Sequence, residues 1–281
     1  MKLYRFEKIT EERLQTLENG GLWFSSPKMF NDLSDCRLNM IVEPDRRILS
    51  NDFLNSINLD DFDTPLDNDI AKILLDIIKN NTNENMKLFI NGDINGKIFR
   101  NEHNQIKVRD HITETTGVCC FFSSAPLNSL MWAHYGDNHK GFCIEYEVDT
   151  DNIACREMLF EVNYVSSLPE ISPEELLFSP HSTITRVLAS KPTEWSYEME
   201  YRLVLYNGLS GSEKGKGKFV DLPNWIKPTN IICGVRQKLD NGNYKNDINY
   251  QMETLSTRLK ASRSRVFEKN GTLDLQNISK R

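Results

Sequence analysis

The sequence contains no run of about 20 apolar residues, which is the length that a membrane-spanning helix requires. The first residues, MKLYRFEKITEERL, also lack the hydrophobic core of a signal peptide. These two absences predict a cytoplasmic protein that has no membrane partner.

Metal-binding spacings are missing too. No CxxC pair occurs, and the adjacent Cys119 and Cys120 point to opposite faces of a predicted strand, which argues against a structural zinc site. His134 and His139 lack a third ligand at motif spacing, so no metal is expected. In the cytosol we expect reduced, buried thiols at Cys36, Cys119, Cys120, Cys143, Cys155 and Cys233.

The common nucleotide and hydrolase motifs are absent as well. The chain has no Walker A loop and no GxGxxG, which disfavours a P-loop NTPase and a Rossmann dehydrogenase. It also has no HExxH and no GxSxG. Any chemistry must therefore come from other groups of residues.

The composition is that of a soluble globular protein. The chain has 281 residues, of which 39% are hydrophobic and 26% are charged, enough for one large domain or two small ones. A formal net charge of −6 excludes a uniformly basic nucleic-acid coat. Two basic stretches, 214–218 and 258–265, still permit local contact with phosphates, although such runs are usually solvated faces.

The order of elements predicts a mixed α+β fold. Thr10 as N-cap, with Leu14 and Leu17 on one stripe, predicts an early helix, and Asn270-Gly271 predicts a late hairpin. Residues 50–112 are rich in Asn and Asp, and we interpret them as a helical insertion in a single catalytic domain, 1–281. Other strands are predicted at 2–6, 22–25, 118–123, 142–148, 160–165, 197–206 and 231–235, and other helices at 129–135, 173–190 and 246–260.

The segment EWSYEMEYRLVLY (194–206) places charges on a predicted strand. Residues two apart on a strand share a face, so Glu198, Glu200 and Arg202 are expected together. Two carboxylates that close raise the pKa of at least one of them, and Arg202 can relieve the repulsion. Composition alone favours an exposed charge ladder of little energetic value, and the alternative is the wall of a functional site.

Two further blocks combine aromatic and polar side chains. LWFSSPKMFND (22–32) joins aromatics, two hydroxyls and an Asn-Asp turn, and MWAHYGDNHKGFCIEY (131–146) includes Trp132, His134 and Tyr135. Such density suits a flat heterocyclic ligand. The alternatives are a packed strand end for the first block and an ordinary polar turn for the second.

These blocks resemble a widespread bacterial family of unknown function. The resemblance rests on a YR start, a WFSxPxxFND block, a WxHYxxxHxGF block and a WxYExEYR strand, and it covers most of the chain outside the insertion. It does not name a reaction.

The order of parts is more distantly similar to that of ADP-ribosyltransferases, which bind NAD in a cleft between two small antiparallel sheets. The resemblance implies that Arg5 is the NAD-holding residue of the first strand. It implies a nicotinamide pocket shaped by Ser25 or Ser26, or by the block around Trp132. After the first strand and the nicotinamide pocket, the superfamily has a late strand that carries a catalytic Glu. The resemblance implies that Glu198-x-Glu200 corresponds to this strand.

The roles that follow are expectations from this resemblance. Glu200 would stabilise the oxocarbenium-like ribosyl centre, Glu198 would orient or deprotonate the acceptor, and Arg5 would pair with the pyrophosphate or the ribose. Trp132 or Tyr135 would stack on nicotinamide, and Arg202 would keep both carboxylates ionised. The expected NAD-binding residues are Tyr4, Arg5, Trp23, Ser25, Ser26, Asn31, Trp132, His134, Tyr135 and Arg202.

The leading hypothesis is therefore an NAD-consuming ADP-ribosyltransferase, as a bacterial toxin or an anti-phage effector. Its acceptor would be a protein, RNA or DNA, and an antitoxin or defence partner is expected. The alternatives are an NAD glycohydrolase, a non-catalytic nucleotide-sensing module, and a nuclease that binds a divalent metal through Glu198, Glu200 and Asp32.

Overall fold

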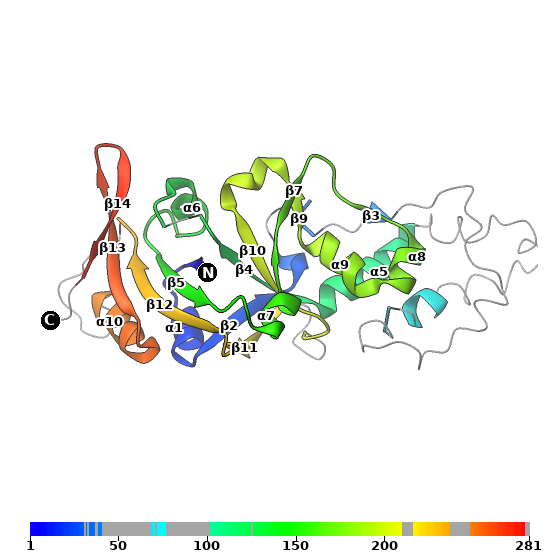
Figure 1. Cartoon of the computed structure of the whole chain (residues 1–281), viewed down its shortest axis with the longest axis horizontal. Coiled ribbons are helices and arrows are strands. Elements are labelled where there is room, and N and C mark those ends of the chain that lie inside the picture. Colours follow the sequence, from blue (N-terminus) through cyan, green and yellow to red (C-terminus); the bar gives the residue numbers. More distant parts are fainter. Residues whose placement is uncertain are drawn as a thin grey trace, which may run out of the picture.

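A computed structural model gives the arrangement of the chain (Figure 1). The residues that it describes are 1–30, 32, 34–36, 39–40, 69–70, 72–76, 102–124, 126–209, 216–236 and 248–278. The strands are β1 (Lys2–Glu7), β2 (Gly21–Ser25), β3 (Asn39–Met40), β4 (Gly117–Phe122), β5 (Phe142–Val148), β6 (Leu159–Glu161), β7 (Asn163–Val165), β8 (Glu170–Ile171), β9 (Ser190–Pro192), β10 (Glu200–Leu205), β11 (Gly217–Asp221), β12 (Ile226–Cys233), β13 (Ser262–Lys269) and β14 (Thr272–Asn277). The helices are α1 (Glu11–Glu18), α5 (Glu102–Thr115), α6 (Ser129–His134), α7 (Ile153–Met158), α8 (Pro173–Phe178), α9 (Pro180–Leu188) and α10 (Ile248–Leu259), with 3₁₀ turns η1 (Pro27–Met29) and η4 (Thr193–Glu198).

One sheet dominates the part of the chain that the structure describes. Its ten strands include the path β11-β2-β4-β1-β5-β12-β13-β14, with β10 paired to β4 and β6. All of these pairs are antiparallel except β12 with β13. The mixed α+β class is confirmed. The finer prediction of a pair of small antiparallel sheets is not, because the strands on both sides of β4 are joined through it.

The sheet forks at β4. Strand β10 runs along one edge of β4 from Gly117 to Phe122. The other edge is shared, because β1 meets it in one residue pair at Phe122 and β2 meets it in one residue pair at Val118. Between these two contacts the carbonyl of Cys120 accepts a hydrogen bond from the side chain of Arg5 at 3.0 Å. The guanidinium thus satisfies a backbone acceptor that neither strand reaches.

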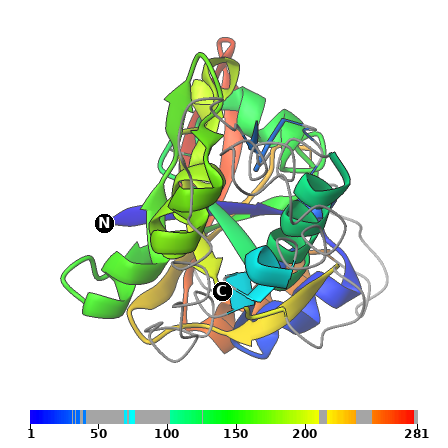
Figure 2. The same ribbon diagram turned by 90° about the vertical axis from the view of Figure 1, so that its right-hand side faces the viewer.

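Helices cover both faces of the sheet and one end of it. Helices α1, α7 and α10 contribute to the largest apolar cluster, whereas α6 packs on a second cluster that includes Phe6 and Val266. Helices α5, α8 and α9 gather at the end opposite β13 and β14 (Figure 1), and they face the viewer in Figure 2. They bury a third cluster against Val118 and Val204. No helix among the described residues is long and apolar enough to cross a membrane.

Several local predictions are confirmed. Helix α1 begins after Thr10, whose hydroxyl accepts from the amide of Arg13, and it buries Leu14 and Leu17. Strand β5 has the predicted bounds. The hairpin between β13 and β14 turns at Asn270-Gly271, where both residues have positive φ.

Other predicted elements are interrupted. The predicted helix 173–190 is two helices, because Pro180 disfavours a helical conformation at Ser179, where φ is −146°. The predicted strand 160–165 is the two short strands β6 and β7. The predicted strand 197–206 starts only at Glu200, since the preceding residues form η4 and Met199 is left-handed, with φ of 47°.

Most of the predicted insertion, 50–112, lies outside the described residues. The described parts are 69–70, 72–76 and 102–112, and they are helical, the last of them belonging to α5. The first two parts bury Ile70 and Leu74 in the same apolar cluster as Ile112 of α5 and Leu188 of α9. This packing places both parts over the end of the sheet where β4 and β10 pair. The prediction of a single domain stays a prediction.

The turn between α6 and β5 is held in an uncommon conformation. Asp137, Asn138 and His139 all have positive φ, which costs free energy in residues other than glycine. Tight contacts surround them: a Cβ atom on Gly141 would lie 2.3 Å from the carbonyl oxygen of Glu7. The turn therefore fixes α6 against the end of β1.

We predict that Gly141→Ala destabilises the protein by roughly 2–3 kcal/mol, because backbone must move to admit the methyl group. Urea denaturation measures the change in the free energy of unfolding. The exposed neighbour Lys140 provides the control, and Lys140→Ala should change this free energy by less than about 0.5 kcal/mol. Equal effects of the two substitutions would contradict the close approach.

Candidate functional site

A cleft of about 560 Å³ lies at the fork of the sheet. Its lining draws on β1, β2, η1, β4, α6, β9 and β10. Five of the residues predicted from sequence to form a site line it, namely Arg5, Ser25, His134, Tyr135 and Glu200. The fold therefore joins the first and last predicted motifs in one cavity.

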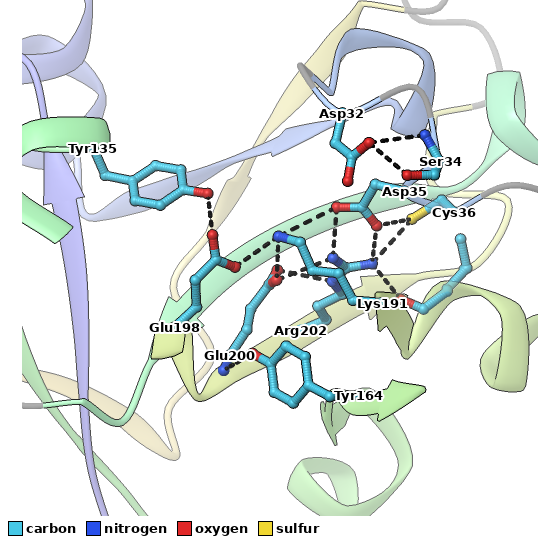
Figure 3. Close-up of polar contacts among 11 residues, drawn as sticks. Asp32, Ser34, Asp35, Cys36, Tyr135, Tyr164, Lys191, Glu198, Glu200 and Arg202 are labelled. Carbon is cyan, nitrogen blue, oxygen red and sulfur yellow. Dashed lines mark hydrogen bonds and ion pairs between the residues drawn. The ribbon is translucent and has the colours of Figure 1, made fainter. Parts of the chain in front are cut away.

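The charges of the segment 194–206 are buried. Glu198 and Arg202 are 0% exposed and Glu200 is 1% exposed, so the exposed charge ladder favoured by composition is wrong. Burying ions costs several kcal/mol each unless partners compensate. The compensating partners come from elsewhere in the chain, and Figure 3 shows them converging on these three side chains.

Arg202 is the centre of this buried group. Its Nε and Nη2 donate to Oε1 and Oε2 of Glu200 at 2.8 and 3.0 Å, in a bidentate pair. Its Nη1 and Nη2 also reach the two carboxylate oxygens of Asp35 at 2.8 and 2.9 Å. Nη1 further donates to the carbonyl of Leu188, at the end of α9. Arg202 therefore joins β10 to two distant segments.

Lys191 is the second cation of the group (Figure 3). Its Nζ lies 2.6 Å from Glu198 Oε2, 3.1 Å from Glu200 Oε2 and 3.5 Å from Asp35 Oδ2. The other oxygen of Glu198 accepts a hydrogen bond from the Tyr135 hydroxyl at 2.5 Å. Three carboxylates thus face two cations, and the fully ionised group carries one net negative charge.

The pKa values of Glu198 and Glu200 are shifted in opposite directions. Burial alone would raise the pKa of Glu200, but the charge and hydrogen bonds of Arg202, together with Lys191, outweigh burial and lower it to about 2. Burial raises the pKa of Glu198, and Lys191 and Tyr135 oppose that rise only in part. Lys191 stays protonated, because the carboxylates around it outweigh burial and raise its pKa. Glu200 is therefore the fixed carboxylate and Glu198 the titratable one.

Backbone geometry explains how both glutamates reach one place. The left-handed residue Met199 turns the chain between η4 and β10, and its carbonyl accepts from the amide and the hydroxyl of Ser123. The amide of Glu200 donates to the Tyr164 hydroxyl at 2.8 Å. The sequence prediction put Glu198 and Glu200 on one face of a strand. They do converge, but across a turn instead of along a strand.

Arg5 enters the cleft from β1. Its Nε donates to Glu7 at 2.6 Å, and its Nη1 donates to the Cys119 sulfur and the Cys120 carbonyl, both at 3.0 Å. Its Nη2 makes no hydrogen bond to any residue that the structure describes. A rigidly held guanidinium with one free edge suits an anionic ligand.

Other predicted site residues do not line the cleft. Trp132 is fully buried, packs edge-on against Phe6 and donates to the Pro126 carbonyl, so it is a core residue and is not available for stacking. Ser26 is buried and donates to the carbonyl of Thr113, which is a structural role.

Three more lie near the cleft without lining it. Tyr4 faces the α6 cluster and donates to Glu145. Trp23 on β2 packs under the guanidinium of Arg13, which belongs to α1. Arg202 lies beneath the residues that line the cleft, and it pairs with Glu200 and Asp35 but not with Glu198. It therefore stabilises the ionised form of only one of the two glutamates that it was predicted to pair with. Asn31 lies outside the described residues.

Sequence reasoning missed Lys191 and Asp35. Neither belongs to a motif with its own spacing, and Lys191 sits in the plain stretch ASKPTEW. The available signal is charge balance, because two glutamates buried beside one arginine require a second cation. Nothing in the sequence says which lysine supplies it.

A metal centre is not supported by the donor set. The oxygens of Glu198 and Glu200 already face Lys191 and Arg202, which occupy the positions that a cation would take. Within the described ranges no group of three or more His, Cys, Asp and Glu side chains is arranged to hold a metal ion. Burial raises the pKa of the nearby Cys36 and Cys120 thiols, so they are poor ligands and poor nucleophiles.

Residues 131–203 match DUF2971, a family described as a protein of unknown function. The matched segment contains Tyr135, Lys191, Glu198, Glu200 and Arg202. The predicted resemblance to a family of unknown function is thereby confirmed, and the more distant resemblance to ADP-ribosyltransferases is not shown. No curated protein and no solved structure matches the chain.

We predict that Glu200 makes the protein sensitive to acid. Its pKa is about 2 in the folded state against an ordinary value of 4.5, so the unfolded state takes up the proton first as pH falls. Stability from this group is complete above pH 4.5 and is lost toward pH 2. Between pH 5 and pH 3 the wild type should lose roughly 2 kcal/mol more than Glu200→Gln.

Urea denaturation at a series of pH values makes this comparison. Glu194→Gln is the matched control, because Glu194 is an exposed carboxylate on the same segment, and it should follow the wild-type curve. Parallel curves for the wild type and Glu200→Gln would show that Arg202 does not hold Glu200 ionised.

Proposed function

We propose that this protein is an ADP-ribosyltransferase that consumes NAD. The observation that carries the proposal is that Arg5, at the end of β1, and Glu200, at the start of β10, line the same cleft. The fork at β4 supports an arrangement like that of ADP-ribosyltransferases, since β1 and β2 diverge from one edge and leave the cleft between them.

Glu200 suits the ribosyl centre of NAD. Cleavage of the bond to nicotinamide develops positive charge on the ribose, and a carboxylate that stays ionised stabilises it. Arg202 and Lys191 fix the orientation of Glu200, and the Cys120 thiol lies close enough to help lower its pKa. A ribose hydroxyl is a stronger donor than a thiol and can replace it.

The other walls suit the rest of the dinucleotide. Arg5, Lys8 and Arg13 line the cleft, and they provide the cations that a pyrophosphate needs, although Glu7 in the same wall already pairs with both arginines. Tyr135 and Phe122 both line the cleft, and their rings pack at a tilt of 32° with centroids 5.0 Å apart. Tyr135 and Phe122 thus supply the aromatic surface that the buried Trp132 does not offer to a ligand.

The geometry favours NAD chemistry over a metal-dependent nuclease, because the oxygens of Glu198 and Glu200 are bound to cationic side chains. The acceptor, whether protein, RNA or DNA, and a role as a toxin or an anti-phage effector belong to the same proposal. An NAD glycohydrolase and a nucleotide sensor are the outcomes that the experiment below separates from transfer.

The test uses the full chain with NAD that carries a radioactive adenylate phosphate, with and without bacterial lysate. We expect release of nicotinamide together with label on a macromolecule. Glu200→Gln should lower kcat/KM at least about 100-fold, as expected for loss of a transition-state charge partner. Arg5→Lys should raise KM for NAD roughly tenfold, since it loses charge-assisted hydrogen bonds.

The exposed carboxylate Glu194 again supplies the control, and Glu194→Gln should keep wild-type turnover. Thermal unfolding of each variant separates loss of chemistry from loss of fold. Nicotinamide release without labelling would identify hydrolysis, and NAD binding without turnover would identify a sensor. Either result, or a folded Glu200→Gln with full activity, would overturn the proposal.

A further inference from the structure

Glu198 has no direct access to the cleft. It is 0% exposed, and it is absent from the cleft wall, which Tyr135, Lys191 and Glu200 form around it. A carboxylate in this position cannot touch an acceptor, contrary to the role expected for it from the sequence. Any proton that reaches it must pass through a neighbour.

Tyr135 is the neighbour that connects Glu198 to the cleft. Its hydroxyl donates to Glu198 Oε1 at 2.5 Å (Figure 3). It caps the C-terminus of α6 and lines the cleft. The opposite oxygen of Glu198 is held by Lys191 at 2.6 Å, so the carboxylate is fixed in the orientation that receives the tyrosine proton. The carboxylate therefore lies behind the phenol and the ammonium, both of which line the cleft.

We propose that Tyr135 and Glu198 form a proton relay that activates the acceptor in the transfer reaction. The inference rests on the proposed function. As the acceptor oxygen or nitrogen forms its bond to the ribose carbon, the bond from that carbon to nicotinamide breaks. The acceptor proton moves to the Tyr135 oxygen, and the Tyr135 proton moves to Glu198. Nicotinamide leaves as a neutral molecule, and the proton on Glu198 returns to solvent through Tyr135 after the product has left.

Charge balance favours Glu198 as the proton acceptor. Asp35, Glu198 and Glu200 face Lys191 and Arg202, so one proton brings the buried group from one net negative charge to neutrality. That proton does not go to Glu200, which the bidentate arginine keeps ionised. Two carboxylates whose environments separate them in this way divide the electrostatic and the acid–base roles.

The groups that face Glu198 fix the direction of the pH dependence. They are Lys191 from β9, Glu200 from β10, and three tyrosines: Tyr135 from the C-cap of α6, Tyr164 from β7 and Tyr197 from η4. Lys191 stays charged and the tyrosines stay protonated, because burial and the carboxylates raise the pKa of each phenol. Glu198 is then the group that titrates, and protonated Glu198 cannot accept another proton. Transfer should therefore be lost as pH falls through its raised pKa.

The decisive variant is Tyr135→Phe, which keeps the ring and removes the hydroxyl. With labelled NAD and the lysate, kcat should fall about 100- to 1000-fold, the range for loss of general acid–base catalysis, while KM for NAD changes less than about threefold. The matched control is Tyr201→Phe, because Tyr201 is the cross-strand partner of Glu161 between β10 and β6 and does not line the cleft. Its kcat should equal that of the wild type.

Glu198→Gln acts through Tyr135, and its readout is the pH profile of kcat. The wild type should lose activity with unit slope on the acid side, whereas Glu198→Gln and Tyr135→Phe should be slow and flat there. If Glu198→Gln fails to fold, the pH dependence of kcat for Tyr135→Phe is compared with that of the wild type instead. Absence of nicotinamide release from the wild type would overturn the proposed function together with the relay. An active wild type with Tyr135→Phe at half its kcat or more would overturn the relay alone.

Discussion

The buried guanidinium of Arg202 is the interaction on which the site depends. It is fully excluded from solvent, and it binds Glu200, Asp35 and the carbonyl at the end of α9. Removing such a charge from water costs several kcal/mol, so the position is tolerable only when all of these partners are in place together. β10, the segment around Asp35 and α9 must therefore assemble as one unit. The floor of the cleft is rigid for the same reason.

The fork of the sheet supplies the space above that floor. Because β10 occupies one whole edge of β4, strands β1 and β2 share the other edge and touch it only at its two ends. A regular sheet would close this gap with backbone hydrogen bonds. Here the side chain of Arg5 donates a hydrogen bond to the Cys120 carbonyl, which would otherwise accept one from a neighbouring strand, and it also lines the cleft. One side chain thus completes the sheet and contributes to the site.

Electrostatics gives the two glutamates different properties although they are two residues apart. Glu200 contacts both cations and is held ionised, whereas Glu198 contacts Lys191 and a neutral phenol, and burial dominates its pKa. The left-handed turn at Met199 creates this difference, because it places Glu198 beside α6 and Glu200 above Arg202. A continuous strand would have exposed both carboxylates to the same surroundings.

The sequence by itself determined the elements whose causes are local. The cap at Thr10, the apolar stripe of α1, the alternation of β5 and the Asn270-Gly271 turn all act within a few residues, and each was predicted. It also singled out Arg5, Tyr135 and Glu200, which the fold brings to one cleft. Only the tertiary structure decided which aromatic residue is core, as for Trp132, and which charges are buried. Those outcomes depend on partners far away in the chain: Asp35 lies 167 positions from Arg202, and no local pattern connects a buried ion to a counter-ion at that distance.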